Sequence, residues 1–214
     1  LSALKDADAE VVLLTHSFAS PTTEKLIADF LGQFPNVRHV VYDALSDAEA
    51  LDAFEIAYGS RVLPTYDFAK AEVIVSVGAD FLGDWQGGGH SAGYAKGRIP
   101  NKHHGKATMS KHYQFESNMT LSGASADVRV PSTPATQKQV LAAIYGALVG
   151  KFDTSALSKK VAAQVNTAIK QLKRAGKNAV VVTGLPSVDA QRIALAINEL
   201  LKSRVIDTQH TTTI

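Results

Sequence analysis

Two kinds of apolar pattern alternate along the chain: short runs of branched apolar residues, and longer stretches with an apolar residue every three or four positions. The short runs predict buried strands, and the longer stretches predict amphipathic helices. Because strands separated by helices are typical of βαβ units, we expect an α/β fold. This fold would be a Rossmann-like, mostly parallel sheet with helices on both faces. The expected strands are residues 10–15, 37–42, 71–77 and 178–183, with 205–207 as a further candidate, and the expected helices are residues 22–34, 46–58, 137–149, 155–174 and 190–202.

Local signals mark the ends of two expected helices. Ser46, followed three residues later by Glu49, matches the capping-box pattern that begins many helices. Gly59 and Gly176 follow the ends of two periodic stretches, where glycine commonly terminates a helix. We therefore expect one helix to begin at Ser46 and two helices to end at these glycines.

Residues 83–134 show neither kind of periodicity. The segment contains a triglycine at 87–89, which could approach a ligand or form a loop tip, and several histidines. Long stretches without regular structure are uncommon in compact domains and are usually functional or packed against a partner. The sequence therefore predicts one α/β domain over residues 1–214 with a long irregular insertion at about 83–134. Because the first residue is Leu1 rather than Met, we expect this domain to be a fragment of a larger chain.

Composition narrows the classes of function. The 214 residues are 45% apolar and 20% charged, with a formal net charge of +2, which is the profile of a soluble globular protein. The cations are scattered apart from a cluster in residues 102–111, so we expect no nucleic-acid partner. No apolar run approaches the length of a membrane span, so we expect no direct membrane insertion. The chain has no cysteine, which excludes disulfides, thiolate metal sites and iron–sulfur clusters held by this chain.

Two turns of similar form follow the first and fourth expected strands. They read THSFASPTTEK and TGLPSVDAQR, and they place Thr15, Ser17, Gly184 and Ser187 where a strand meets a helix. Backbone N–H groups at such a helix start can bind an anion. Every strand-to-helix connection also needs a tight turn and a cap, and neither segment has a glycine-rich nucleotide motif. Anion binding and a purely structural role both stay open.

Other candidate chemistry lacks the required partners. His90, His103, His104 and His112 do not follow a metal-binding spacing, so solvated loop histidines are the favoured interpretation and we predict no metal site. No GxSxG nucleophile motif is present, so we predict no catalytic residue. Two residues apart on an extended chain, Asp127 and Arg129 would share a face and could form a local ion pair.

A resemblance rests on the segment HYQFESNMTLSGASADVRVP, residues 112–131, and the STPATQKQVLAAIYGALVG that follows it. This order of a short strand, an E-S-x-x-T-x-[ST]-G turn, an A-D-x-R segment, a proline and a helix resembles molybdopterin oxidoreductases. With AEVIVSVGADFLGDW, residues 71–85, it is more narrowly similar to the molybdopterin-oxidoreductase-like, iron–sulfur subunit of bacterial alternative complex III. NAVVVTGLPSVDAQRIALAINELL resembles the strand and helix that follow in this superfamily.

The resemblance implies a place in a larger respiratory assembly. The parent chain would carry iron–sulfur clusters in a separate cysteine-rich part, and a molybdopterin cofactor would have been lost. The partners would be other subunits of a membrane respiratory complex, located at the periplasmic face of the inner membrane, with this fragment itself soluble. Positions that match the family's motifs, together with the two turns, give the cofactor-binding candidates, which we interpret as vestigial: Thr15, Ser17, Gly78, Asp80, Ser117, Gly123, Asp127, Arg129, Gly184 and Ser187.

Three functions follow as hypotheses. The first is a non-catalytic α/β domain of a respiratory, molybdopterin-oxidoreductase-like subunit, in which the whole complex oxidises quinol and transfers electrons. The second is a domain that binds a pterin guanine dinucleotide or another nucleotide at the carboxyl edge of the sheet. The third is a structural module that docks other subunits.

Overall fold

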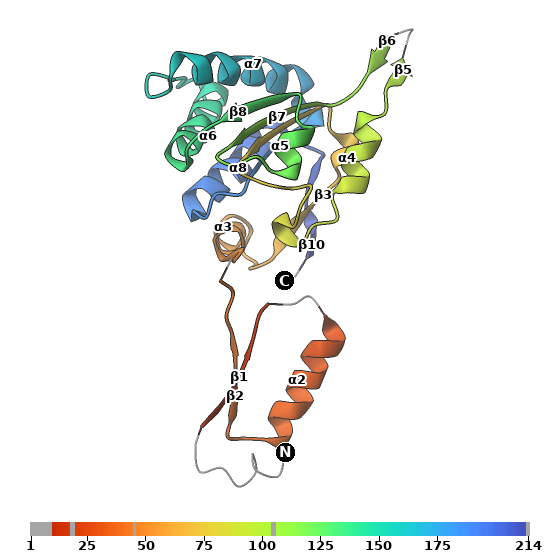
Figure 1. Cartoon of the computed structure of the whole chain (residues 1–214), viewed down its shortest axis with the longest axis vertical. Coiled ribbons are helices and arrows are strands. Elements are labelled where there is room, and N and C mark those ends of the chain that lie inside the picture. The colour runs from red at the N-terminus through yellow and green to blue at the C-terminus, as the bar shows by residue number, and fades with distance from the viewer. Residues whose placement is uncertain (1–9, 18–19, 45, 104–105, 213–214) are drawn as a thin grey trace. The chain divides into compact units, whose positions relative to one another are not determined.

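A computed structural model describes residues 10–17, 20–44, 46–103 and 106–212 of the chain (Figure 1). The chain divides into two compact units. Unit 1 comprises Leu1–Ser46 with Thr213–Ile214, and unit 2 comprises Asp47–Thr212.

Unit 1 is a strand, a helix and a second strand. The strands β1 (Val11–Thr15) and β2 (Val37–Val41) pair in parallel, and helix α2 (Pro21–Gln33) connects them. Ser20 caps the helix, since its side-chain oxygen accepts a hydrogen bond from the backbone N–H of Thr23 at 3.3 Å. The expected order of strand, helix and strand is confirmed in this unit.

Unit 2 is built on a parallel sheet of four strands in the order β8-β7-β4-β9. The central pair is β4 (Val73–Val77) and β7 (Lys111–Glu116). The outer strands are β8 (Val128–Pro131) and β9 (Ala179–Thr183). β4 and β9 are buried at every residue, as their mostly apolar sequences predict.

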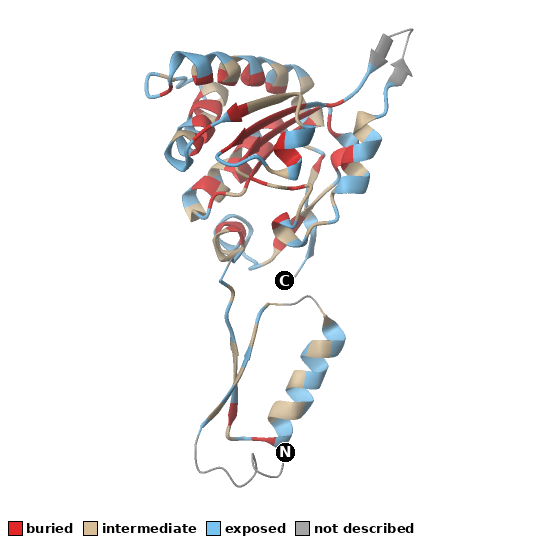
Figure 2. Ribbon diagram, in the orientation of Figure 1, coloured by how far each residue is buried: buried red, intermediate tan, exposed pale blue. Residues whose placement is uncertain are grey.

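Helices cover both faces of this sheet (Figures 1 and 2). On one face, the largest apolar core joins the sheet to α6 (Pro134–Leu148), α7 (Lys159–Ala175) and α8 (Val188–Leu201). A second core on the other face contains Phe68, Phe81, Trp85 and Tyr94. The elements that supply them include η1 (Phe68–Lys70), η2 (Trp85–Gly87) and α4 (Ser91–Arg98). The predicted α/β fold with a mostly parallel, helix-covered sheet is confirmed.

Two smaller strand pairs complete unit 2. β3 (Leu63–Tyr66) and β10 (Ile206–Thr212) pair antiparallel, and the pairing shifts register between Asp207 and Thr211. β5 (Asn101–His103) and β6 (Lys106–Thr108) form a second antiparallel pair. Helix α3 (Ala48–Tyr58) precedes β3, and its residues Ala53 and Phe54 pack with Leu195 of α8.

The prediction of a long irregular segment at 83–134 is wrong. This segment contains α4, β5, β6, β7, α5 (Leu121–Ser125) and β8, including a central strand of the sheet. The apolar pattern did not reveal β7 because polar side chains fill one of its two buried faces.

The observed helix ends match those predicted from the sequence only in part. α3 begins at Ala48, with Asp47 rather than Ser46 as its N-cap residue, so the helix starts later than the capping-box pattern predicts. Gly59 ends α3 in the left-handed conformation at φ 82°, as expected. Gly176, at φ 53°, ends α7.

Candidate functional site

The strand order identifies the edge where an open α/β sheet usually binds a ligand. β7 and β8 extend the sheet to one side of β4, whereas β9 lies on the other side, so the order reverses between β4 and β9. Ligands of such folds bind in the crevice beyond the carboxyl ends of the two strands at this switch point. The predicted residues Gly78, Asp80, Gly184 and Ser187 follow these two strands.

The chain itself occupies this switch point. A Cβ atom added to Gly184 would lie 2.3 Å from the carbonyl oxygen of Gly78, so the two connections touch directly. The Thr183 hydroxyl donates to the carbonyl oxygen of Val77 at 2.9 Å, and the Trp85 indole N–H donates to the carbonyl oxygen of Thr183 at 3.1 Å. Backbone that would face a ligand in a binding crevice is therefore bonded within the protein.

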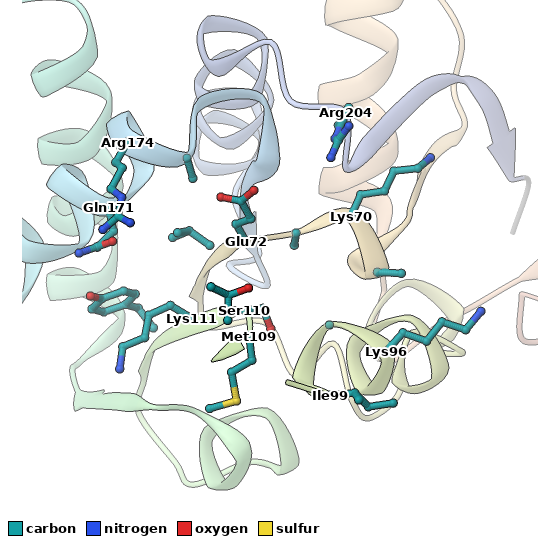
Figure 3. Close-up of a pocket in the computed structure, with 17 residues that line it drawn as sticks. Lys70, Glu72, Lys96, Ile99, Met109, Ser110, Lys111, Gln171, Arg174 and Arg204 are labelled. Atoms are coloured by element: carbon teal, nitrogen blue, oxygen red, sulfur yellow. The ribbon is translucent and has the colours of Figure 1, made fainter. Parts of the chain in front are cut away.

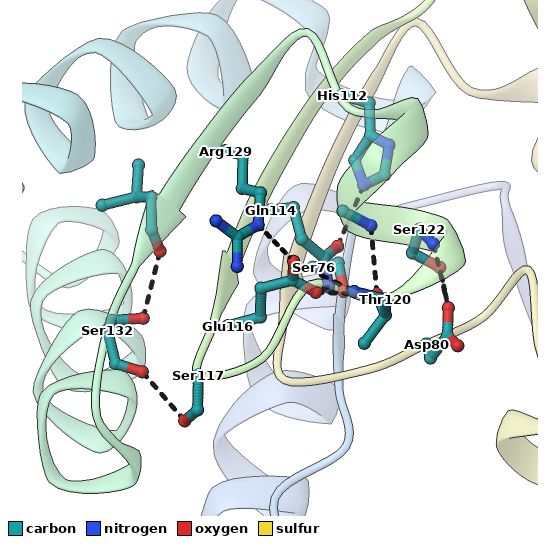
Figure 4. Close-up of polar contacts among 12 residues, drawn as sticks. Ser76, Asp80, His112, Gln114, Glu116, Ser117, Thr120, Ser122, Arg129 and Ser132 are labelled. Atoms are coloured by element: carbon teal, nitrogen blue, oxygen red, sulfur yellow. Dashed lines mark hydrogen bonds and ion pairs between the residues drawn. The ribbon is translucent and has the colours of Figure 1, made fainter.

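A row of buried polar side chains follows β7 to the same carboxyl edge (Figure 4). His112, Gln114 and Glu116 alternate along the strand, share one face, and are each at most 2% exposed. His112 Nε2 lies 3.1 Å from Gln114 Oε1, and Gln114 Nε2 donates to Glu116 Oε2 at 3.2 Å. The same Gln114 nitrogen donates to the carbonyl oxygen of Ala79 at 3.0 Å. The three side chains form one continuous hydrogen-bonded row.

Glu116 is held from several sides. Arg129 of β8 donates from Nε to Oε1 at 2.5 Å, and the Thr120 hydroxyl donates to Oε2 at 2.7 Å. Gly123 of α5 lies so close that an added Cβ would be 1.8 Å from Oε1. A buried carboxylate needs such partners because water cannot solvate it. Its oxygens therefore face donors of the protein itself.

The other end of the row is a neutral histidine. Burial lowers the pKa of His112 to about 4, although the hydrogen bond with Gln114 and the nearby Asp127 and Glu116 charges oppose this effect. A neutral ring that donates from Nε2 to Gln114 leaves Nδ1 as an acceptor. The Tyr94 hydroxyl lies 3.2 Å from Nδ1 and 2.9 Å from the carbonyl oxygen of Ser125, so its single proton serves either acceptor.

Two further predicted residues, Asp80 and Ser117, are bonded at the carboxyl edge. Asp80 Oδ1 accepts from the backbone N–H and the hydroxyl of Ser122 at 2.9 and 2.8 Å. The Ser117 hydroxyl donates to the carbonyl oxygen of Ser132 at 3.0 Å and accepts from Gln137 Nε2 at 3.1 Å. These bonds tie the connections after β4, β7 and β8 together.

The ion pair expected between Asp127 and Arg129 is not formed. Arg129 binds Glu116, whereas Asp127 accepts two hydrogen bonds from Arg98 of α4 at 2.8 and 3.0 Å. Burial opposes ionisation of Asp127, but the bonds from Arg98 and from the backbone N–H of His112 lower its pKa below the ordinary value. Asp127 precedes β8 and bonds to the first residues of β7, so it lies toward the amino edge of the sheet.

The two turns predicted as anion sites differ. In unit 1, Thr15 Oγ1 lies 2.9 Å from His39 Nε2, and the Ser17 backbone and hydroxyl both donate to Asp43. These bonds from Ser17 lower the pKa of Asp43. In unit 2, Ser187 is the N-cap residue of α8 but makes no side-chain capping bond. The predicted hydroxyl groups of unit 1 are therefore already engaged.

The sequence predicted some of the residues at the carboxyl edge of unit 2. Gly78, Asp80, Ser117, Gly123 and Gly184 do lie at the carboxyl edge of unit 2, and Arg129 of β8 binds Glu116 at that edge. The prediction missed Gln114 and Gln137, and it interpreted His112 as a solvated loop residue, whereas the side chain is fully buried. Alternation of His112, Gln114 and Glu116 with aromatic residues was the available signal for a strand with one polar face. Within the described residues, no three His, Cys, Asp or Glu side chains gather as a possible metal site.

A pocket of about 650 Å³ lies at the opposite edge of the same sheet (Figure 3). We call it the amino-edge pocket, because Val73 begins β4 and Lys111 begins β7 at its wall. Five cationic side chains and one carboxylate line it. They are Lys70, Lys96, Lys111, Arg174 and Arg204, with Glu72. No residue predicted as a cofactor-binding candidate lines this pocket.

Comparison with known proteins finds a similar fold among solved structures. No protein-family model and no curated protein matches the chain. The structure of the formyltransferase/hydrolase complex (FhcABCD) from Methylorubrum extorquens, in complex with methylofuran, contains a chain of similar fold with a TM-score of 0.58. The identity is 14%, and the match covers 94% of this chain and 52% of that chain. This chain therefore spans about half the length of its structural neighbour.

This comparison overturns the expected family. The matching fold belongs to a formyltransferase/hydrolase complex, so the assignment to molybdopterin oxidoreductases and to alternative complex III is wrong. The quoted motif instead forms a central strand and the internally bonded edge of the sheet. A respiratory complex as partner and a periplasmic location rested on that resemblance and have no other support. Across the described part of the chain, no helix combines the length and the apolar character that a bilayer crossing requires. The structural neighbour is itself part of an assembly of several subunits.

Proposed function

We propose that this chain is a non-catalytic α/β domain that serves as a structural part of a multi-subunit complex. The observation that carries this proposal is the carboxyl edge of unit 2, where backbone and side chains bond to one another. Gly184 contacts Gly78, Glu116 binds Arg129, and Asp80 binds Ser122. A sheet edge built in this way supports a fold rather than a reaction.

Acid–base catalysis would need a titratable group directed at a substrate cavity. Glu116 is 2% exposed and accepts hydrogen bonds from Arg129, Thr120 and Gln114. His112 is fully buried, and both of its ring nitrogens have protein partners. Neither group can reach a substrate without breaking this network.

The fold comparison suggests which partners to test first. The neighbour is part of a formyltransferase/hydrolase complex, and 94% of this chain superimposes on it. We therefore infer that the partners are other subunits of an assembly of that kind. In this role the domain contributes buried structure and contact surface, and the chemistry belongs to other parts of the complex.

Purification of the tagged full-length protein from its source organism tests this proposal. We expect it to elute in a fixed stoichiometry with subunits of a formyltransferase/hydrolase complex, measured by native mass spectrometry. A purified chain that stays a monomer and turns over a substrate by itself would contradict the proposal.

The alternative of a nucleotide site at the carboxyl edge has its own test. Guanosine mono- and diphosphate at millimolar concentration would raise the melting temperature if either bound there, since a ligand of the native state stabilises it by RT ln(1 + [L]/Kd). A shift abolished by Asp80→Asn but retained in Lys111→Gln would place the nucleotide at the carboxyl edge. We expect no such pattern.

A further inference from the structure

The amino-edge pocket gathers cations, most of which form no ion pair within the described residues. Lys96 comes from α4, Lys111 from β7 and Arg174 from α7, and Arg204 lies between α8 and β10. Within the described residues, none of these four side chains forms an ion pair. Lys70 does pair, with Asp67 at 3.1 Å, but both side chains are about half exposed. Elements far apart in sequence thus direct positive charge to one concave surface.

The negative charge in the pocket is already engaged. Glu72 Oε1 accepts a hydrogen bond from Asn178 Nδ2 at 2.6 Å. This one carboxylate cannot balance the four cations that form no ion pair, so the pocket carries excess positive potential. Concave surfaces lined by one sign of charge raise the local concentration of oppositely charged ligands.

The lining of the amino-edge pocket also contains a buried hydroxyl group and two apolar side chains. Ser110, at 3% exposure, lines the pocket, and its hydroxyl oxygen has no hydrogen-bond partner in the described part of the chain. Its backbone is fixed, because its N–H donates to Gly97 and its carbonyl oxygen accepts from Arg98. Buried hydroxyl groups without a partner are uncommon and indicate a missing one. Ile99 and Met109, at 68% and 51% exposure, add apolar surface to the lining.

The cations form two groups with Glu72, Ser110 and Met109 between them (Figure 3). Lys111 and Arg174 lie on one side, and Lys70, Lys96 and Arg204 lie on the other. A ligand that satisfies both groups needs negative charge at two positions.

We propose that the amino-edge pocket binds a small molecule that carries at least two anionic groups, phosphates or carboxylates. Its volume, about 650 Å³, is within the range of small-molecule sites. Guanidinium and ammonium groups bind phosphate and carboxylate oxygens through charge-assisted hydrogen bonds. The concavity favours a small ligand over an acidic segment of a partner protein, which would need a longer surface. This site is separate from the carboxyl edge, so the proposal does not depend on the proposed structural role.

Isothermal titration calorimetry of the purified chain with inorganic tripolyphosphate and, separately, with citrate tests the proposal. Tripolyphosphate represents ligands whose anionic groups are phosphates, and citrate represents ligands whose anionic groups are carboxylates. We expect at least one of them to bind with one-to-one stoichiometry, more weakly at high ionic strength. The double variant Lys111→Gln with Arg174→Gln should weaken binding at least tenfold, because each charged hydrogen bond contributes on the order of a factor of ten.

Two further variants separate a pocket from general charge attraction. Glu72→Gln keeps an oxygen to accept from Asn178 but removes the negative charge, so it should tighten anion binding by roughly threefold. Lys138→Gln removes an exposed cation of α6, outside the pocket, and should leave affinity unchanged. Circular dichroism would confirm that all variants stay folded.

Three results would overturn the proposal. These are no binding of either anion at millimolar concentration, equal losses in Lys138→Gln and in the double variant, and weaker rather than tighter binding by Glu72→Gln. Binding of an acidic peptide but of neither small anion would also contradict it.

Discussion

The two edges of one parallel sheet differ in how their charges are used. At the carboxyl edge, the Glu116 carboxylate is buried and bound by Arg129, and its neighbours are hydrogen-bonded in turn. At the amino edge, cations such as Lys111 and Arg174 line a pocket and form no ion pair within the described residues. α/β sheets usually place ligands at the carboxyl edge. Here the polar groups of that edge bond to one another, and the cations that form no ion pair within the described residues lie at the opposite edge.

The difference shows that strand topology alone does not place a binding site. Topology brings connections to an edge, but the side chains decide whether those connections bond to one another or to a ligand. If this comparison is correct, substitutions at the carboxyl edge will reduce stability, whereas substitutions in the amino-edge pocket will leave it nearly unchanged.

The largest expected effect is that of Arg129→Met. This change leaves the buried Glu116 carboxylate without its cationic partner, which should reduce the free energy of unfolding by about 3–4 kcal/mol. Urea denaturation would measure the loss. The double variant Arg129→Met with Glu116→Gln should recover much of it, because no buried charge remains. A loss below about 1 kcal/mol in the single variant would show that the pair is not important for stability.

Acid should destabilise the protein through His112. Its pKa is about 4 in the folded state and 6.5 in the reference state, so the unfolded chain takes up a proton first as the pH falls. The contribution of neutral His112 to the free energy of unfolding is therefore fully present above pH 6.5. It decreases by up to about 3 kcal/mol as the pH falls through 4. Unfolding measured between pH 7 and 4 should show this slope, and His112→Gln should flatten it. An equal slope in both proteins would assign the effect to other groups.

The close approach of Gly123 to Glu116 gives a smaller effect. An alanine Cβ would overlap the carboxylate, so Gly123→Ala should displace it from Arg129 and cost about 2 kcal/mol. Thermal unfolding would measure this cost. Gly32→Ala is a matched control, because no atom lies within 4 Å of the added Cβ. If both variants had the same stability, the observed packing at Gly123 would be wrong.

The smallest expected effect is at the amino edge. Lys111→Gln and Arg174→Gln remove exposed cations that form no ion pair with any described residue, so each should change the free energy of unfolding by less than about 0.5 kcal/mol. Denaturant titration at low ionic strength would detect even a small gain in stability from reduced charge repulsion. A loss of 2 kcal/mol in either variant would remove the contrast between the two edges.

The sequence predicted the parts of the fold that depend on apolar burial. β4 and β9 are mostly apolar runs, and α7 places its apolar residues on one face, so these elements were expected at nearly their observed positions. The apolar pattern did not mark β7, which only the family resemblance gave as a short strand, because its buried polar face depends on partners from other elements. β3 was also not marked, since a short strand that contains Pro64 has no clear local signal.

The sequence predicted where the candidate site lies, but not which of its residues contact one another. Asp80 and Gly184 follow buried strands, so their place at the carboxyl edge could be inferred. That Gly184 contacts Gly78 and that Arg129 pairs with Glu116 rather than Asp127 depend on tertiary packing. The amino-edge pocket combines residues from separate elements, and no local pattern in the sequence marks them as neighbours.

The pairing of β3 with β10 has a consequence for synthesis on the ribosome. Tyr66 pairs with Ile206, so the earlier strand emerges long before its partner has been translated. During that interval its backbone groups could pair with a strand of another nascent chain. Pro64 lacks an N–H group, so β3 has one hydrogen-bond donor fewer while it is unpaired. The proline that hides this strand from sequence patterns thus also limits wrong pairing until translation reaches β10.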